Sequence, residues 1–140
     1  MTEQNNQGPS SGLTPHLSIP DKRASEAIDF YVKAFSATEH VRMSADDGVR
    51  LMHAHLSLNG ASLMLADDFP EYHGGGASPP AAGVVLHLQV DNVDTWYDRA
   101  IAAGAETIMP PEDMFWGDRY AQVKDPFGHR WAIGAPVKAA

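Results

Sequence analysis

The chain has 140 residues, of which 18 are acidic and 10 basic, and its formal net charge is −8. Nucleic-acid binding needs a basic face, so this balance disfavours a nucleic-acid partner and is compatible with a neutral or cationic small molecule. The absence of cysteine excludes disulfides and thiolate chemistry. Because no apolar run approaches the length that spans a bilayer and no signal-peptide pattern is present, we expect a cytoplasmic protein without a membrane partner.

The chain is predicted to begin with a disordered tail, because residues 1–12 are polar and show no periodicity. A strand over residues 13–19 then leads to a helix, for which Asp21 is the expected N-cap. The helix is predicted from apolar residues that recur at helical spacing: Ala24, Ala27, Ile28, Tyr31, Val32 and Phe35. Another strand is expected over residues 38–43.

A hairpin is predicted over residues 51–66, since Asn59-Gly60 is the strongest short hairpin signal. Its first arm alternates, so two sets of side chains are expected on opposite faces: Met52, Ala54, Leu56 and Leu58 on one, and His53, His55 and Ser57 on the other. The first module is therefore predicted over residues 13–67. Residues 68–82, rich in glycine and proline, are expected to be an irregular linker.

The same plan returns over residues 83–135, the predicted second module, which is followed by a tail over 136–140. Its expected elements are a strand over 84–90, a helix capped by Asp91 or Asn92 and ended by Gly104, a strand over 106–109, a loop over 110–117, and a hairpin closed by Asp125-Pro126-Phe127-Gly128. The letters repeat too, because His16-Leu17-Ser18-Ile19 resembles His87-Leu88-Gln89-Val90. These patterns predict an α+β fold of two tandem βαβββ modules with mainly antiparallel sheets. Modules of this size are not expected to be stable alone, so the sheets should meet.

If each helix covers the apolar face of its sheet, the opposite faces carry a distinctive set of side chains. They are His16, Ser18, His53, His55, Ser57, Met64, His87, Gln89, Tyr120, Gln122, Arg130 and Ala132. These faces are either ordinary solvated surfaces of antiparallel sheets or the lining of a partly enclosed cavity. The apolar members of the set favour the cavity.

The chain resembles a PhnB-like member of the vicinal oxygen chelate superfamily, which includes glyoxalase I, bleomycin-resistance proteins and extradiol dioxygenases. The residues that carry the resemblance are Thr14-Pro15-His16-Leu17, Ala27-Ile28-Asp29-Phe30-Tyr31, Met52-His53-Ala54, Leu63-Met64-Leu65-Ala66-Asp67, Phe69-Pro70-Glu71, Leu86-His87-Leu88, Met114-Phe115-Trp116-Gly117-Asp118-Arg119-Tyr120, Asp125-Pro126-Phe127-Gly128-His129 and Trp131. The resemblance implies U-shaped sheets around a cavity and a homodimer.

In metal-using members of that superfamily, four His or Glu side chains from the first and last strands of both modules hold a divalent metal. Transferred by position, these places fall on His16, Met64, Val85 (or His87 after a register slip of two) and Ala132. Neither carboxylate is kept. Isomerisation of the glyoxalase kind needs a metal and a ligand carboxylate that moves a proton, and an oxygenase needs two histidines and a carboxylate around iron. Both routes are unsupported, and no catalytic residue is assigned.

Three hypotheses follow for the function. The first is a protein that binds a small organic molecule in the cavity without the usual metal. The second is a divalent-metal-dependent lyase, isomerase or oxygenase with an all-histidine site of His16, His55 and His87. The third is a non-catalytic dimeric scaffold. The predicted ligand-binding residues are His16, His55, His87, Met64, Gln89, Trp116, Arg119, Tyr120 and Gln122.

Several of these residues also have a purely structural interpretation. Trp116 either stacks on a ligand or packs its loop or a dimer contact. Arg119 either anchors an anion or pairs with Asp118 or Asp125. His129 is expected to be solvated, and Trp96, Trp131 and Phe30 are expected in the core.

Overall fold

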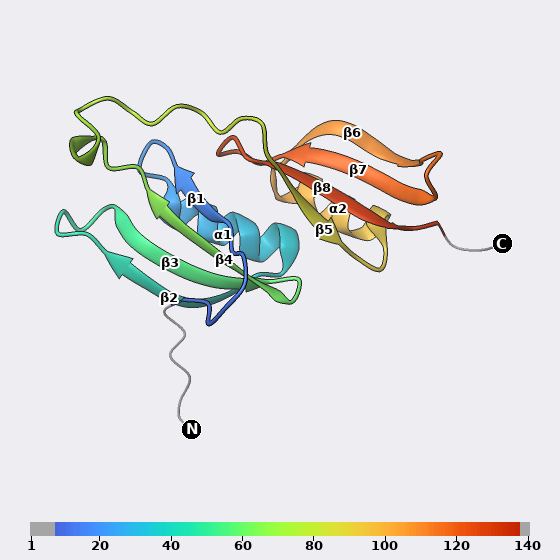
Figure 1. The fold of residues 1–140 in the computed structure, drawn as a ribbon, viewed down its shortest axis with the longest axis horizontal. Helices are drawn as coiled ribbons and strands as arrows, with labels where there is room; N and C mark the ends of the chain where they lie inside the picture. The colour runs from blue at the N-terminus through green and yellow to red at the C-terminus, as the bar shows by residue number, and fades with distance from the viewer. Residues whose placement is uncertain (1–7, 138–140) are drawn as a thin grey trace, which may run out of the picture. The chain divides into compact units, whose positions relative to one another are not determined.

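The computed structural model describes residues 8–137, so the predicted tails over 1–12 and 136–140 lie partly outside the described residues. These residues form two compact units, the first made of residues 8–32 and 36–79 and the second of residues 33–35 and 80–137. Each unit contains one four-stranded mixed sheet (Figure 1). Within residues 8–137, no helix has the length and apolar character needed to cross a membrane.

The first unit follows the predicted βαβββ plan. Its elements are β1 (His16–Ile19), α1 (Ala24–Phe35), β2 (Thr38–Ser44), β3 (Leu51–Leu58), β4 (Ala61–Asp67) and a short 3₁₀ helix η1 (Pro70–Tyr72). The strand order is β1-β4-β3-β2. The β1–β4 pair is parallel, and the other two pairs are antiparallel.

The second unit repeats this topology. Its elements are β5 (Val85–Gln89), α2 (Val93–Ala103), β6 (Glu106–Asp113), β7 (Asp118–Lys124) and β8 (Arg130–Pro136). The strand order is β5-β8-β7-β6, again with one parallel pair, β5–β8. The α+β fold of two βαβββ modules predicted from the sequence is therefore confirmed.

The apolar stripe predicted on α1 is buried, and all of it except Phe35, which belongs to the second unit, lies in the first unit. Ala24, Ala27, Ile28, Tyr31 and Phe35 are all at most 1% exposed. Val32 differs, because 42% of its surface remains exposed. Each fully buried aliphatic or aromatic side chain of this stripe contributes about 1.5–3 kcal/mol to folding.

The Asn-Gly hairpin is formed as predicted. Asn59 and Gly60 have φ angles of 51° and 81°, and Leu58 pairs with Ala61 on either side of them. Two consecutive positive φ angles define a type I′ turn, whose twist matches that of the flanking strands.

The predicted alternation on β3 is wrong at Met52, the second residue of the strand. Met52 was expected to share a face with Ala54, but it is 51% exposed, whereas Leu51 is 4% exposed. The register explains the difference, since Met43 pairs with His53 and Ser44 with Leu51. Met52 is thus the extra residue of a β-bulge, which reverses the side-chain direction at the strand start.

The predicted N-cap of α1 is also wrong. Asp21 has a φ of 62° and lies three residues before the first helical residue, Ala24. The N–H of Ala24 instead donates to Oδ1 of Asp67, at the end of β4. In the second unit, by contrast, the prediction is confirmed because Asn92 Oδ1 accepts from Thr95 N and Gly104 ends the helix.

The predicted loop over residues 110–117 begins with strand. β6 continues through Pro110 and Pro111 to Asp113. Its register slips between Met109 and Glu112, so the two prolines lie in an irregular part of the ladder. β6 is the edge strand of its sheet, where missing N–H donors are tolerated.

The stretch over residues 68–82 is mostly irregular, but η1 lies within it, and Phe69 is only 9% exposed. Its role as a linker, like the module boundaries, stays a prediction.

Candidate functional site

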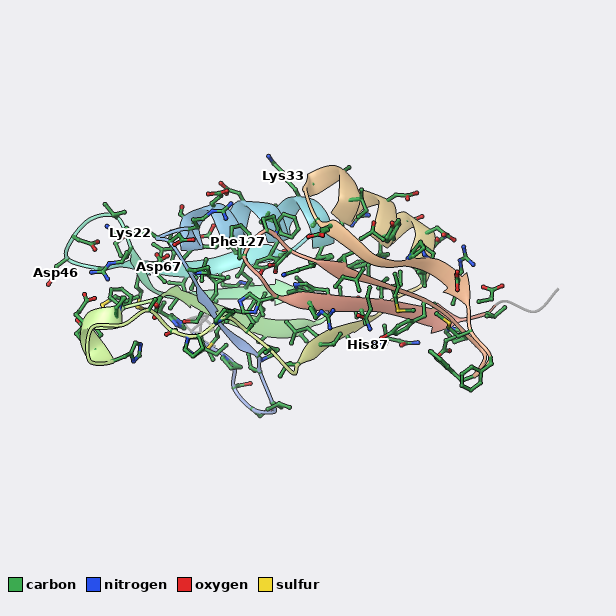
Figure 2. The ribbon with its side chains drawn as sticks, turned by 90° about the horizontal axis from the view of Figure 1, so that it is seen from above. Lys22, Lys33, Asp46, Asp67, His87 and Phe127 are labelled. Atoms are coloured by element: carbon green, nitrogen blue, oxygen red, sulfur yellow. The ribbon has the colours of Figure 1, made fainter. Side chains whose placement is uncertain are left out.

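The second sheet brings five of the predicted ligand-binding residues into one linked set, which we call the β5–β7 cluster: His87, Gln89, Trp116, Tyr120 and Gln122. Two cross-strand rows place most of them. In one row His87 pairs with Ala132 and Ala132 with Gln122. In the next, Gly134 lies between Gln89 and Tyr120. Directly paired residues share a face, so these side chains lie on the side away from α2, where Figure 2 shows His87.

Hydrogen bonds and ring contacts connect the members of the cluster. His87 Nε2 lies 2.8 Å from Gln89 Oε1, which accepts the bond. Gln122 Nε2 donates to Tyr120 Oη at 2.9 Å. The rings of His87 and Tyr120 are nearly parallel, with centroids 6.2 Å apart. The cluster therefore presents polar groups and ring faces together.

Trp116 extends this cluster from the loop between β6 and β7. Its ring meets that of Tyr120 edge to face at 5.7 Å, and its Nε1 donates to Asp118 Oδ2 at 3.1 Å. The side chain is nevertheless 51% exposed, and the neighbouring Phe115 is 96% exposed. Trp116 is thus held in place while much of its indole faces solvent.

Gly134 is a member of the site that the sequence pattern does not reveal. A Cβ at this position would lie 2.9 Å from Cε1 and 3.3 Å from Nε2 of His87, and 3.7 Å from Cδ1 of Tyr120. The imidazole therefore occupies the space that any larger residue would fill. No turn or repeat signal marks this glycine, since it lies inside β8.

Arg119 is not part of the cluster. Its guanidinium forms two hydrogen bonds to Asp94 on α2, at 2.9 and 3.0 Å, and one to Asp113 at 2.9 Å. The expected structural partners, Asp118 and Asp125, were therefore the wrong ones. These bonds raise the pKa of Arg119 and lower that of Asp94. The groups border a depression of about 320 Å³ on the α2 side of the unit.

The first sheet carries a second row of predicted residues. Met64 pairs with His16 on β1 and with His55 on β3. His55 is 5% exposed and its Nε2 lies 2.9 Å from Ser62 Oγ. The ring of His40 lies 5.1 Å from that of His55, and its Nε2 contacts Ser57 Oγ. His16 also borders a depression of about 260 Å³ that extends to Tyr72 and His73.

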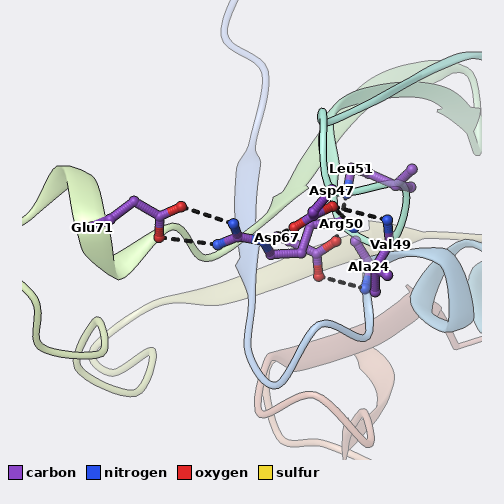
Figure 3. Close-up of polar contacts among 7 residues, drawn as sticks. All are labelled: Ala24, Asp47, Val49, Arg50, Leu51, Asp67 and Glu71. Atoms are coloured by element: carbon purple, nitrogen blue, oxygen red, sulfur yellow. Dashed lines mark hydrogen bonds and ion pairs between the residues drawn. The ribbon is translucent and has the colours of Figure 1, made fainter.

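Each unit contains a buried aspartate that accepts several hydrogen bonds from its own unit. Asp67, 4% exposed, accepts from Ala24 N at 2.9 Å and from Leu51 N at 2.7 Å (Figure 3). Asp125, 3% exposed, accepts from the N–H groups of Phe127 and His129 and from Trp131 Nε1. The role of Asp67 does not show in local sequence, because its donors lie 43 and 16 residues away, whereas the donors to Asp125 lie within six residues of it.

His129 was expected to be solvated, and this is wrong, since only 9% of it is exposed. Trp131 and Phe30 are buried as expected, at 2% and 6%, whereas Trp96 is only partly buried.

Arg50, the residue before β3, bonds to η1 in the first unit. Arg50 forms two hydrogen bonds to Glu71 and one to Asp47 (Figure 3). Its guanidinium lies 4.2 Å from the ring centroid of Phe69. The pKa of Asp47 falls well below its usual range, chiefly because the N–H groups of Arg50 and Val49 donate to it. This set holds the segment that contains Tyr72 against β3.

The positions that the resemblance implies for a metal keep only part of the family's His/Glu donor set. His16 pairs with Met64 and His87 pairs with Ala132, and whether Val85 or His87 holds the family's position on β5 stays a prediction. Met64 and Ala132 carry no carboxylate. Among residues 8–137, no group of three or more His, Asp or Glu side chains is arranged to hold a metal ion. The residues present do not fit the His/Glu set. The combination of His16, His55 and His87 draws on both units and stays a prediction.

Comparison with known proteins identifies the family. The model of the glyoxalase/bleomycin resistance protein/dioxygenase superfamily matches residues 14–133. The chain therefore belongs to this superfamily. Its sequence is 48% identical over 130 residues to the uncharacterized protein Mb0911c of Mycobacterium bovis, covering 90% of this chain and 84% of that protein.

Solved structures share the fold. Protein PA1353 of Pseudomonas aeruginosa superposes with a TM-score of 0.73 at 24% identity, covering 91% of this chain and 98% of that one. The PhnB protein of Bacillus cereus superposes with a TM-score of 0.65 at 19% identity, covering 89% and 99%. The PhnB-like resemblance is thus confirmed at the level of the fold.

Proposed function

We propose that this chain binds a small, planar organic molecule, neutral or cationic, on the β5–β7 cluster, without the His/Glu metal site of its superfamily. The observation that carries the proposal is the linkage of Trp116, Tyr120 and His87 by ring contacts, with Trp116 still half exposed. Aromatic faces attract cations and flat rings, and they do so at little entropic cost when neighbours already hold them.

The polar members of the cluster supply orientation. Gln89 and Gln122 are bonded to His87 and Tyr120, which leaves their amides at fixed positions beside the rings. Small-molecule sites commonly combine an apolar or aromatic surface with a few placed polar groups. The net charge of −8 also disfavours an anionic ligand.

The donor set favours binding over metal-dependent chemistry. Polarisation of a substrate oxygen by a divalent metal would need ligands at Met64 and Ala132, which a thioether and a methyl group do not replace for a hard metal. The cluster supplies a stacking surface and hydrogen bonds. These interactions hold a molecule without reacting with it, which suits a protein that sequesters a compound, as the name bleomycin-resistance protein suggests.

The proposal is tested by isothermal titration with two probes, metal-free bleomycin and the planar aromatic dication DAPI. We expect saturable binding of at least one probe to the wild type and a loss of affinity of about tenfold in Trp116→Leu, since removing one stacking anchor costs roughly 1–2 kcal/mol. Tyr72→Leu is the matched control, because Tyr72 is an exposed aromatic residue of the first unit. Failure of both probes to bind, or equal losses in the two variants, would contradict the proposal.

A further inference from the structure

The first unit contains a row of three side chains whose chemistry differs from both hard-metal sites and ligand-stacking surfaces. His16, Met64 and His55 lie on the neighbouring strands β1, β4 and β3, each directly paired with the next. Directly paired residues point to the same side of a sheet, with Cβ atoms about 4.5–5.5 Å apart. A methionine thioether is therefore flanked by an imidazole on either side.

Contacts with neighbouring side chains fix the His55 end of this row. His55 is 5% exposed and its ring is bonded to Ser62, a residue of the same strand as Met64. The ring of His40 lies beside it at 5.1 Å. The imidazole of His55 is thus directed over β4, toward the methionine strand. His16 lies at the other end, exposed on the edge strand β1.

The two carboxylates that line the same depression as His16 are already engaged. Asp67 accepts two backbone N–H groups, and Asp68 accepts from the backbone and hydroxyl of Ser78. Hard cations prefer carboxylate oxygen, whereas thioether sulfur combined with imidazole selects soft monovalent metals, copper(I) above all. No third imidazole or carboxylate completes a site among residues 8–137, so the sulfur has to supply the third donor.

We propose that His16, Met64 and His55 bind one soft monovalent cation, copper(I) or its analogue silver(I). The site lies wholly within the first unit and goes beyond the proposed ligand-binding function, which is assigned to the second. In the bound state, Sδ of Met64 and one nitrogen of each imidazole coordinate the cation. It requires His16 to turn toward β4 and His55 to exchange its contact with Ser62 for the metal.

The test uses silver(I), which needs no protection from oxidation, in chloride-free buffer. The methyl resonances of the six methionines are followed by NMR during titration. We expect the Met64 methyl signal, identified by its loss in Met64→Leu, to shift and saturate at one equivalent. Imidazole resonances of His16 and His55 should move with the same saturation curve, and zinc at equal concentration should leave the Met64 methyl signal in place.

Affinity in the variants decides whether these three residues form the site. Met64→Leu keeps the volume and Met52→Leu is its matched control, since Met52 is an exposed methionine of the same sheet. We expect Met64→Leu and His16→Ala to weaken silver(I) binding by at least about tenfold, as loss of a metal-supporting residue does, and Met52→Leu to leave it unchanged.

Because His16 is exposed, His16→Ala keeps the fold and remains informative if Met64→Leu unfolds. Wild-type affinity in His16→Ala, an unshifted Met64 methyl signal, or an equal loss in Met52→Leu would overturn the proposal. A loss in His87→Ala comparable to that in His16→Ala would also overturn it, because the site would then need a residue of the second unit.

Discussion

The absence of a side chain at Gly134 leaves room for the imidazole of His87, because a Cβ at residue 134 would lie 2.9 Å from the Cε1 atom of that ring. The two residues lie on neighbouring strands, with Gly134 directly paired to Gln89, two residues after His87. The glycine is therefore part of the site although it carries no functional group.

Replacing Gly134 by alanine should disturb the site more than the fold. The His87 ring is exposed and can swing outward, so we expect a loss in the free energy of unfolding of less than about 1.5 kcal/mol, at the low end for overpacking. The hydrogen bond to Gln89 and the stacking on Tyr120 should be lost. Urea unfolding and the imidazole NMR signals of His87 measure the two effects.

Gly76→Ala is the control for that substitution, since no atom lies within 4 Å of a Cβ at Gly76. It should change neither the His87 signals nor probe affinity. If Gly134→Ala leaves the His87 signals at their wild-type positions, the imidazole does not depend on the glycine and this part of the site is incorrectly described.

Asp125 should be a principal contributor to the stability of the second unit. Its buried carboxylate accepts from three donors, two backbone N–H groups and the indole of Trp131. Asp125→Asn replaces one acceptor oxygen by a donor, so a buried N–H loses its partner and the free energy of unfolding should fall by about 1–3 kcal/mol. Urea unfolding followed by tryptophan fluorescence measures this, and the exposed Asp98→Asn should change it little. Equal effects of the two substitutions would refute the role assigned to Asp125.

Acid should destabilise the protein through its paired surface carboxylates. Hydrogen bonds from arginine lower the pKa of Glu39, Glu71 and Asp94 in the folded state. A group whose folded pKa is lowered contributes stability above its unfolded pKa, about 4 for Asp and Glu, and loses it as pH falls through the folded value. The free energy of unfolding should therefore be nearly constant from about pH 7 to 5 and fall below about pH 4.

Asp47→Asn should reduce the steepness of that acid decline. The pKa of Asp47 in the folded state is lowered by backbone N–H donors and by the side chain of Arg50. At low pH Asp47 therefore takes up a proton when the chain unfolds, which steepens the loss of stability. Asp46→Asn, one residue earlier in the same turn and exposed, should leave the slope unchanged. Urea unfolding at pH 3, 4, 5 and 7 compares the two variants, and identical slopes would show that the bonds of Asp47 do not persist in solution.

Gly60→Ala should destabilise the first hairpin. Its φ of 81° is disfavoured for residues with a Cβ, and the type I′ turn requires it. Because nothing crowds a Cβ at this position, the cost is conformational and should be about 1–2 kcal/mol. Thermal and urea unfolding measure it against Gly76→Ala. Wild-type stability in Gly60→Ala would indicate a different turn in solution.

The sequence predicts the fold well because its signals are local. Periods of two and of 3.6, the Asn59-Gly60 turn and the Asn92 cap need only neighbouring residues to be interpreted. The misses are features fixed by distant residues. The start of α1 depends on Asp67, 43 residues beyond Ala24, and the exposure of Met52 depends on how β2 pairs with β3.

The site could be predicted only in part for the same reason. Alternation placed His87, Gln89, Tyr120 and Gln122 on one face correctly, since that follows from the strand period. It could not show that Arg119 bonds to Asp94 on α2, or that Gly134 makes room for His87, because both depend on which strands and helices become neighbours.

The position of a bound ligand is tested most directly by the indole N–H signals of the three tryptophans. Trp116 donates to Asp118 at the edge of the cluster, whereas Trp131 is buried against Asp125. In a ¹⁵N–¹H titration with metal-free bleomycin or DAPI, whichever binds, the Trp116 signal, assigned by its absence in Trp116→Phe, should shift in proportion to saturation while that of Trp131 stays in place. Saturable binding that leaves the Trp116 signal unmoved would contradict a ligand site on the β5–β7 cluster.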